Sequence, residues 1–172
     1  MRLEDLPSLW SAFWFVLPVL AISIWVAWSD MKFMKIPNAA VLALAAVFIV
    51  IGPIALPFET YLWGIALGLI TLVAGFIASA ARLVGAGDSK FAAAMAPFFA
   101  ESSPALVFVL FSVCLLAAFF AHRLMRLVPP FRAATADWAS WTHRKFPMGL
   151  ALSGTLSFYF LFGLLISARI SP

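Results

Sequence analysis

The chain is poor in charged residues and contains almost no cysteine. Charged side chains make up 10% of its 172 residues, against about 25% in a typical soluble domain. The single cysteine excludes an internal disulfide and a zinc site built from several thiolates. Hydrophobic residues reach 65% and the mean hydropathy is +1.09, more apolar surface than a small soluble fold can bury. This composition excludes a soluble enzyme, a disordered tail and a nucleic-acid-binding module, and it indicates an integral membrane protein.

The apolar residues fall into runs separated by turn signals, and a run of about 20 residues can cross a bilayer as a helix. A run of only ten residues would form a helix about 15 Å long, so we expect the shortest run to be a short or re-entrant helix. We predict an all-α polytopic membrane protein with six membrane helices, the fourth one short, forming a single integral-membrane domain over residues 1–172. The predicted helices are Leu9–Trp28, Asn38–Leu56, Tyr61–Ala81, Phe91–Ala100, Ala105–Phe120 and Met148–Ser167.

The positions of Lys and Arg favour six crossings over five. With the N-terminus outside and six crossings, nine of the eleven basic residues face the inner side, and only Arg2 and Arg169 face the outer side. This bias agrees with the positive-inside rule. Five crossings would instead leave the basic stretch Arg123–Lys145 outside. The overlapping segment Pro129–Phe146 is predicted to lie in the headgroup region as a short amphipathic segment. The alternative is that it forms part of a docking surface for the membrane helix of a partner.

Two aspartates lie at the ends of predicted helices, both on the inner side. Asp30 follows the first apolar run, and Asp88 follows the third. An acid at the membrane edge is costly unless the protein uses it. Two neighbouring carboxyl groups repel when both are ionised, so one keeps a proton where the other does not. The ionised group can take a proton from water while the protonated group polarises a peptide carbonyl, which is the chemistry of aspartic proteolysis and needs no metal or cofactor.

The residues around the two acids suit an active site. Gly85 and Gly87 can take positive φ and allow close backbone approach, so this loop is able to present Asp88 to an extended peptide. Lys90 is expected to favour the ionised form of Asp88. Pro37 is compatible with the first turn of the second helix. His122 and His143 have no partners at ligand spacing, so we expect no metal site.

These residues, taken in order, resemble a known family. Asp30, Ile36-Pro37-Asn38 and Gly85-Ala-Gly87-Asp88-Ser-Lys90 are similar to the motifs of the type IV prepilin peptidases, a family of GxGD membrane aspartic proteases. Lys145-Phe-Pro147-Met-Gly149 resembles the start of that family's last helix. The resemblance implies that Asp30 and Asp88 are the catalytic pair. Residues expected to bind substrate or shape the site are Lys32, Ile36, Pro37, Asn38, Gly85, Gly87 and Lys90.

The resemblance also implies a substrate and a location. Family members remove a short basic leader from pilin or pseudopilin precursors at the cytoplasmic face of the bacterial inner membrane. In such a membrane the Lys and Arg bias of this chain predicts a periplasmic N-terminus. Larger members carry a cytoplasmic region with paired CxxC motifs and also methylate the product. Here only nine residues separate Ser29 from Ala39, so the chain resembles the short form that serves tight-adherence (Flp-type) pili. The expected partners are the precursor and membrane lipid, and a homo-oligomer stays open.

Two other interpretations fit parts of the sequence. A GxGD protease of the signal-peptide-peptidase kind would cut within the membrane, but Ser29 stands where a tyrosine would precede the first aspartate. A non-catalytic membrane subunit of a pilus or secretion machine would have no need of both acids. A cut at the inner edge of the membrane would exclude the intramembrane protease. Cleavage by the purified protein without a partner would exclude the non-catalytic subunit.

Overall fold

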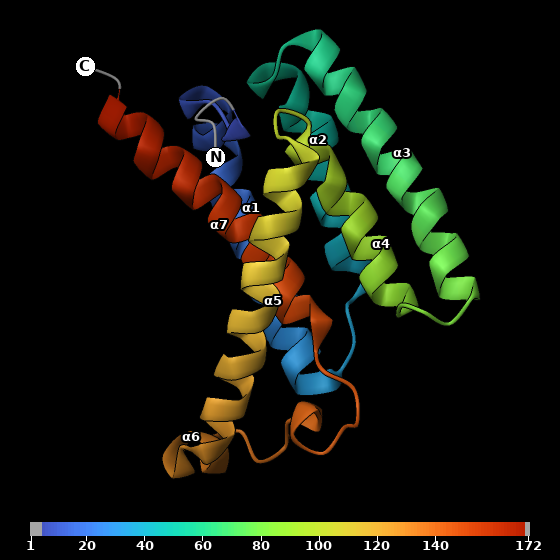
Figure 1. Ribbon diagram of the computed structural model, residues 1–172, viewed down its shortest axis with the longest axis vertical. Coiled ribbons are helices and arrows are strands. Elements are labelled where there is room, and N and C mark those ends of the chain that lie inside the picture. Colours follow the sequence, from blue (N-terminus) through green and yellow to red (C-terminus); the bar gives the residue numbers. More distant parts are fainter. Residues whose placement is uncertain (1–4, 171–172) are drawn as a thin grey trace.

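The computed structural model describes residues 5–170, and every regular element in this range is a helix (Figure 1). Arg2 and the side chain of Arg169 lie outside the described part of the chain. The predicted all-α polytopic class is confirmed, because five helices are long and apolar enough to cross a membrane. These helices are α1 (Leu9–Phe33), α2 (Asn38–Ala55), α3 (Phe58–Ala80), α5 (Pro104–Leu127) and α7 (Met148–Ile170).

The predicted short fourth segment is a helix in two parts. It consists of α4 (Ala86–Met95), with 10 residues, followed directly by the 3-10 helix η2 (Ala96–Phe99), with 4 residues. In Figure 1 the chain reverses direction between α3 and α4 and again between η2 and α5, so the α4–η2 segment returns the chain to the end where α1 begins. Both α4 and η2 pack along α3, and α4 also contacts α2 and α7.

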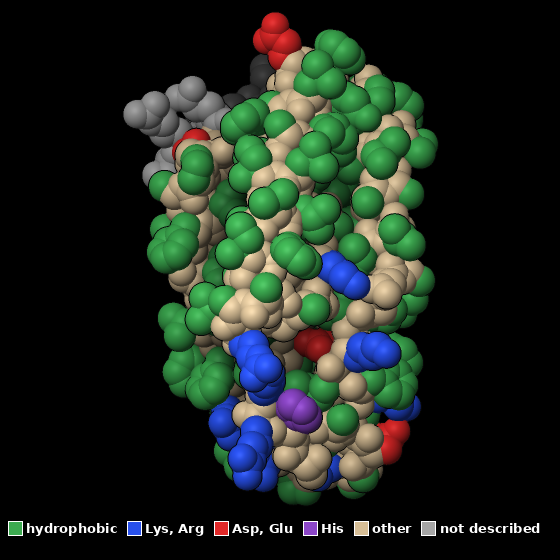
Figure 2. All heavy atoms as spheres, turned by 90° about the vertical axis from the view of Figure 1, so that its right-hand side faces the viewer, with side chains coloured by type: hydrophobic (Ala, Val, Ile, Leu, Met, Phe, Trp, Pro, Cys, Tyr) green, Lys and Arg blue, Asp and Glu red, His purple; other side chains and the backbone are tan. Residues whose placement is uncertain are grey.

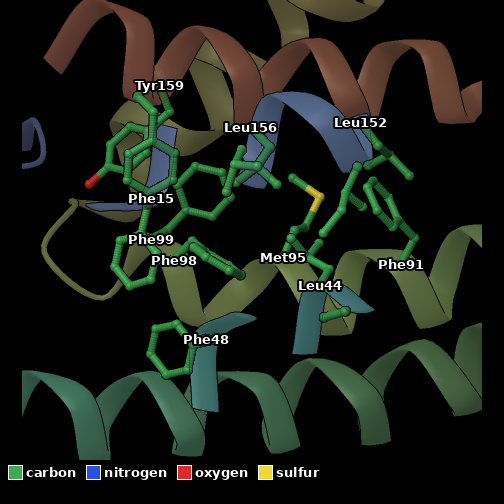
Figure 3. Close-up of a cluster of buried hydrophobic side chains, with 14 of the residues drawn as sticks. Phe15, Leu44, Phe48, Phe91, Met95, Phe98, Phe99, Leu152, Leu156 and Tyr159 are labelled. Atoms are coloured by element: carbon green, nitrogen blue, oxygen red, sulfur yellow. The ribbon is translucent and has the colours of Figure 1, made fainter. Parts of the chain in front are cut away.

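Aromatic side chains from four elements form the centre of the core (Figure 3). Phe98 of η2 lies edge-on to Phe15 of α1 at a ring distance of 5.0 Å and to Phe48 of α2 at 5.2 Å. Phe160 of α7 completes the cluster 5.6 Å from Phe15. Lipid tails are as apolar as these rings, so close van der Waals packing is what holds such helices together in a membrane. The buried α4–η2 segment therefore anchors α1, α2 and α7 around it.

The stretch after α5 differs from the prediction. Helix α5 continues past Phe120 to Leu127, and His122 lies within it, buried and stacked on Trp141 at 4.9 Å. Residues 129–146 form α6 (Pro129–Ala134) and the 3-10 helix η3 (Ala139–Trp141) with turns around them. The segment is therefore two short helices joined by turns and not one continuous stretch, because the buried Trp141 packs against α5 and donates a hydrogen bond to the Thr135 carbonyl. Its place in the headgroup region stays a prediction.

Candidate active site

Asp30 lies in the last turn of α1 and is 5% exposed. The helix ends where Met34 adopts the left-handed conformation (φ 52°) and donates its backbone N–H to the Asp30 carbonyl at 2.9 Å. The Ser29 hydroxyl donates to the Lys35 carbonyl at 2.9 Å. These two bonds turn the chain back on itself, so the segment after α1 stays beside the Asp30 side chain.

The start of α7 holds the Asp30 carboxylate in place. The backbone N–H of Gly149 donates to Asp30 Oδ2 at 2.7 Å. This N–H belongs to the first turn of α7, where amides have no partner inside the helix and the helix dipole attracts negative charge. A Cβ at position 149 would lie only 2.9 Å from both Cβ and Oδ2 of Asp30. Glycine is therefore required here by the close approach of α1 and α7.

Asp88 lies in the first turn of α4, after the N-cap residue Gly85. A Cβ on Gly85 would lie 2.6 Å from Asp88 Oδ2, so the carboxylate folds back over this glycine. Both glycines of the motif lie in the described chain and avoid positive φ, with Gly85 at −65°. Neither glycine uses the positive φ that its residue type allows, and Gly85 serves the close approach that the sequence also suggests. Gly87 faces Ile36, whose Cβ would be 3.6 Å from an added Cβ.

Asp30 and Asp88 line one cavity of about 490 Å³ at the end of the bundle where α1 ends and α4 begins. They are close enough for the charge of Asp88 to act on Asp30. The cavity unites segments far apart in the sequence: the end of α1, the start of α2, the start of α4 and the loop into α7. Its remaining lining residues are Met34, Lys35, Ile36, Asn38, Gly85, Ala86, Gly87, Lys90, His143, Lys145, Phe146 and Met148.

Positive charge surrounds the cavity. In Figure 2, Lys and Arg side chains and a histidine gather at one end of the molecule around a recessed acidic group, below a mainly hydrophobic face. Burial raises the pKa of Asp88 above its ordinary value, and the positive charge of Lys145 partly offsets this rise. Lys90 instead donates to Asn38 Oδ1 at 3.4 Å. The cation whose charge acts on Asp88 is thus Lys145. Lys90 lines the cavity, and its part in binding substrate or shaping the site stays a prediction.

The structure brings together most of the predicted site residues. Ile36, Asn38, Gly85, Gly87 and Lys90 all line the cavity with the two aspartates. Two others lie elsewhere. Pro37 is the N-cap residue of α2. Lys32 points to the loop after α6, where its ammonium pairs with Asp137 at 3.1 Å and lies 5.6 Å from the centre of the Trp28 ring.

Sequence reasoning missed three contributors to the cavity. The backbone amide of Gly149, the charge of Lys145 and the ring of His143 all come from the segment before α7 or its first turn. The Lys145–Gly149 stretch was recognised as a motif, but its hydrogen bond to Asp30 depends on packing between α1 and α7. Within the described residues, no cluster of His, Cys, Asp and Glu has the arrangement of a metal site.

Comparison with known proteins agrees with this geometry. The family model of the type IV leader peptidases matches residues 15–122, which include Asp30, Asp88, most of α1 and all of α4. Comparisons with curated proteins and with solved structures gave no match. The match covers more than half of the 172 residues, and the chain therefore belongs to the type IV leader peptidase family and is a multi-pass membrane peptidase.

Proposed function

We propose that this protein is an aspartic endopeptidase that removes the short basic leader from type IV prepilin or pseudopilin precursors of the Flp kind. The observation that carries the proposal is the shared cavity of Asp30 and Asp88 at one end of the membrane helices. The family is defined by leader peptidases, and this supports a precursor substrate. The basic residues gathered at the cavity end support an inner-membrane protein whose active site faces the cytoplasm.

The proposed reaction uses the aspartates as a pair. One carboxylate takes a proton from a water molecule as its oxygen attacks the carbonyl carbon of the scissile peptide. The other, protonated, donates a hydrogen bond to the carbonyl oxygen as negative charge develops there. The tetrahedral intermediate then collapses, the C–N bond breaks, and the leaving nitrogen receives a proton from the pair. Both products leave without a covalent enzyme intermediate.

Different surroundings support different behaviour of the two acids. Asp30 is nearly fully buried and accepts a backbone hydrogen bond from Gly149. Asp88 lies partly exposed at the N-terminus of α4, with the charge of Lys145 nearby. Two coupled carboxyl groups in unlike environments share one proton over a range of pH, which is the state that the reaction needs.

Separate Asp30→Asn and Asp88→Asn variants test the proposal. Asparagine keeps an oxygen that can accept the Gly149 hydrogen bond, so we expect folded protein and a loss of precursor cleavage of about 100-fold or more, the contribution typical of acid–base groups. Asp137→Asn is the control, because this aspartate is exposed and outside the cavity. The assay uses purified protein in detergent and maps the cleaved bond. Full activity in either cavity variant, or a cut in the middle of the substrate helix, would overturn the proposal.

A further inference from the structure

A second, apolar groove opens beside the catalytic cavity. It has a volume of about 300 Å³ and lies where α2, α3 and α4 meet. Figure 1 shows α4 between α2 and α3, and these two outer helices barely contact each other. The groove floor is buried, with Ala93 and Ala94 less than 10% exposed, while Ile49 and Leu69 on its walls are 56% and 59% exposed. The space between α2 and α3 is therefore open to the membrane.

The groove follows the helix axes. Its lining residues recur at helical spacing on α2 (Val41, Ala45, Phe48, Ile49), on α3 (Ile65, Gly68, Leu69, Leu72) and on the α4–η2 segment (Lys90, Ala93 and Ala94 of α4, Pro97 of η2). The α2 stripe covers eight residue steps, or about 12 Å along the helix axis. A guest helix parallel to α2 and α3 would lie along this groove for two turns.

Lys90 lines both the groove and the catalytic cavity. It therefore marks the point where the polar cavity passes into the apolar groove. A peptide whose leader crosses the cavity would run past Lys90 and continue beside Val41 into the membrane. This continuity connects the groove to the reaction and distinguishes it from the other apolar surfaces of the bundle.

We propose that this groove binds the apolar helix that follows the cleavage site of the substrate. The inference rests on the proposed function and adds to it the surface that holds the uncleaved part of the precursor. The small side chains on the floor favour a helix, because helices in membranes associate where small residues let their backbones approach closely. Binding there fixes the distance from the substrate helix to the carboxylates and so selects the bond that is cut.

A pair of neighbouring substitutions on α2 tests the groove. Ala45 lines it, whereas Ala46 is exposed on another face of the same helix. We expect Ala45→Trp to lower kcat/KM about tenfold or more for a model precursor with a basic leader and an apolar helix of ~20 residues. The same variant should cleave a soluble peptide with only the leader and the first mature residues as well as wild type does. Ala46→Trp should leave both substrates unaffected.

The other outcomes show whether the inference about the groove or the proposed function has failed. If wild type cleaves the precursor but Ala45→Trp and Ala46→Trp behave alike, lipid fills the groove and the inference fails. If Ala45→Trp impairs both substrates equally or changes the oligomeric state, the groove supports the fold or binds a second copy, and the inference also fails. If wild type cleaves neither substrate, the proposed function itself is wrong.

Cross-linking gives a measurement that does not depend on the tryptophan variant. Leu72 lines the groove, and the next residue, Val73, is exposed outside it. In an Asp88→Asn background, which is expected to leave the precursor intact, Leu72→Cys should cross-link to a cysteine in the first turns of the precursor helix several-fold more than Val73→Cys. Equal cross-linking from both positions would overturn the inference.

Discussion

The carboxylate of Asp30 accepts its hydrogen bond from the backbone N–H of Gly149, 119 residues later in the chain. The bond joins the end of α1 to the start of α7, two helices that pack extensively against each other. The donor of this bond is a backbone amide at the start of a helix, which is held more rigidly than a side-chain donor would be. One carboxylate of the proposed pair therefore has a defined position before any substrate binds.

Gly149→Ala should disable the site. The added Cβ would stand 2.9 Å from Asp30 Oδ2, and either the carboxylate or the start of α7 must move. A displacement of this size at reacting groups lowers activity by about 100-fold. Initial rates of precursor cleavage would measure the loss. Gly154→Ala in the same helix is the control, because its Cβ meets Cys114 at an ordinary 3.8 Å and alanine stabilises a helix by up to about 1 kcal/mol.

The two glycines of the Gly85–Asp88 motif should respond differently to alanine. Gly85→Ala places a Cβ 2.6 Å from Asp88 Oδ2 and pushes the carboxylate away, so activity should fall about 100-fold. Gly87→Ala meets Ile36 at 3.6 Å, which is normal contact, and should keep most of the activity. Cleavage rates of the two variants, each with a thermal unfolding curve, provide the check. Equal loss in both variants would contradict this account of Gly85.

Lys145→Met should change the pH dependence of cleavage. The charge of Lys145 lowers the pKa of Asp88 against the larger rise caused by burial. Without this charge the pKa rises further, so a higher pH is needed to ionise Asp88, and the acidic limb of the kcat/KM profile should move to higher pH. Lys90→Met is the control and should leave the limb in place, because Lys90 bonds to Asn38. A limb that moves in both variants would show that the general positive potential matters.

Glu101→Gln should stabilise the protein at neutral pH. Burial raises the pKa of Glu101 above 4.5, although the Ser11 hydroxyl donates to its carboxylate at 2.8 Å. A carboxyl group with a raised pKa destabilises the fold where it is ionised, and this penalty grows as pH rises through the pKa of the folded state. Glutamine can accept the same bond without charge. Its Tm should exceed that of wild type at neutral pH, and the difference should shrink below pH 4.5. A difference independent of pH would indicate altered packing instead.

Lys32→Met should cleave precursor at nearly the wild-type rate. The Lys32 ammonium pairs with Asp137 at the exposed end of the bundle and does not line the cavity. Exposed ion pairs contribute little to stability, and methionine preserves the apolar stem that packs beside Trp28. Comparing its cleavage rate with that of Asp137→Asn checks that Lys32 lies outside the active site. A large loss of activity in Lys32→Met alone would show that Lys32 takes part in cleavage.

Local properties of the sequence determined the membrane helices and the positions of the acids along them. The length of an apolar run decides whether a helix can cross the bilayer, and the bias of Lys and Arg decides which side its ends face. They predicted the short α4–η2 segment and put Asp30 and Asp88 at the same side. The motifs around these acids were sufficient to indicate the family, because their order and spacing do not depend on how the helices pack.

Only the tertiary structure decided which groups contact the two acids. The contacts of the Gly149 amide and of Lys145 with the acids depend on how α1, α4 and α7 pack, and sequence distance does not encode this. The groove beside Lys90 depends in the same way on how α2, α3 and α4 pack. Lys32 and Lys90 are near the acids in sequence, but each lies on a helix face that directs it to another partner, Lys32 to Asp137 and Lys90 to Asn38. Contacts between helices depend on the faces that meet, and these are set only when the bundle closes.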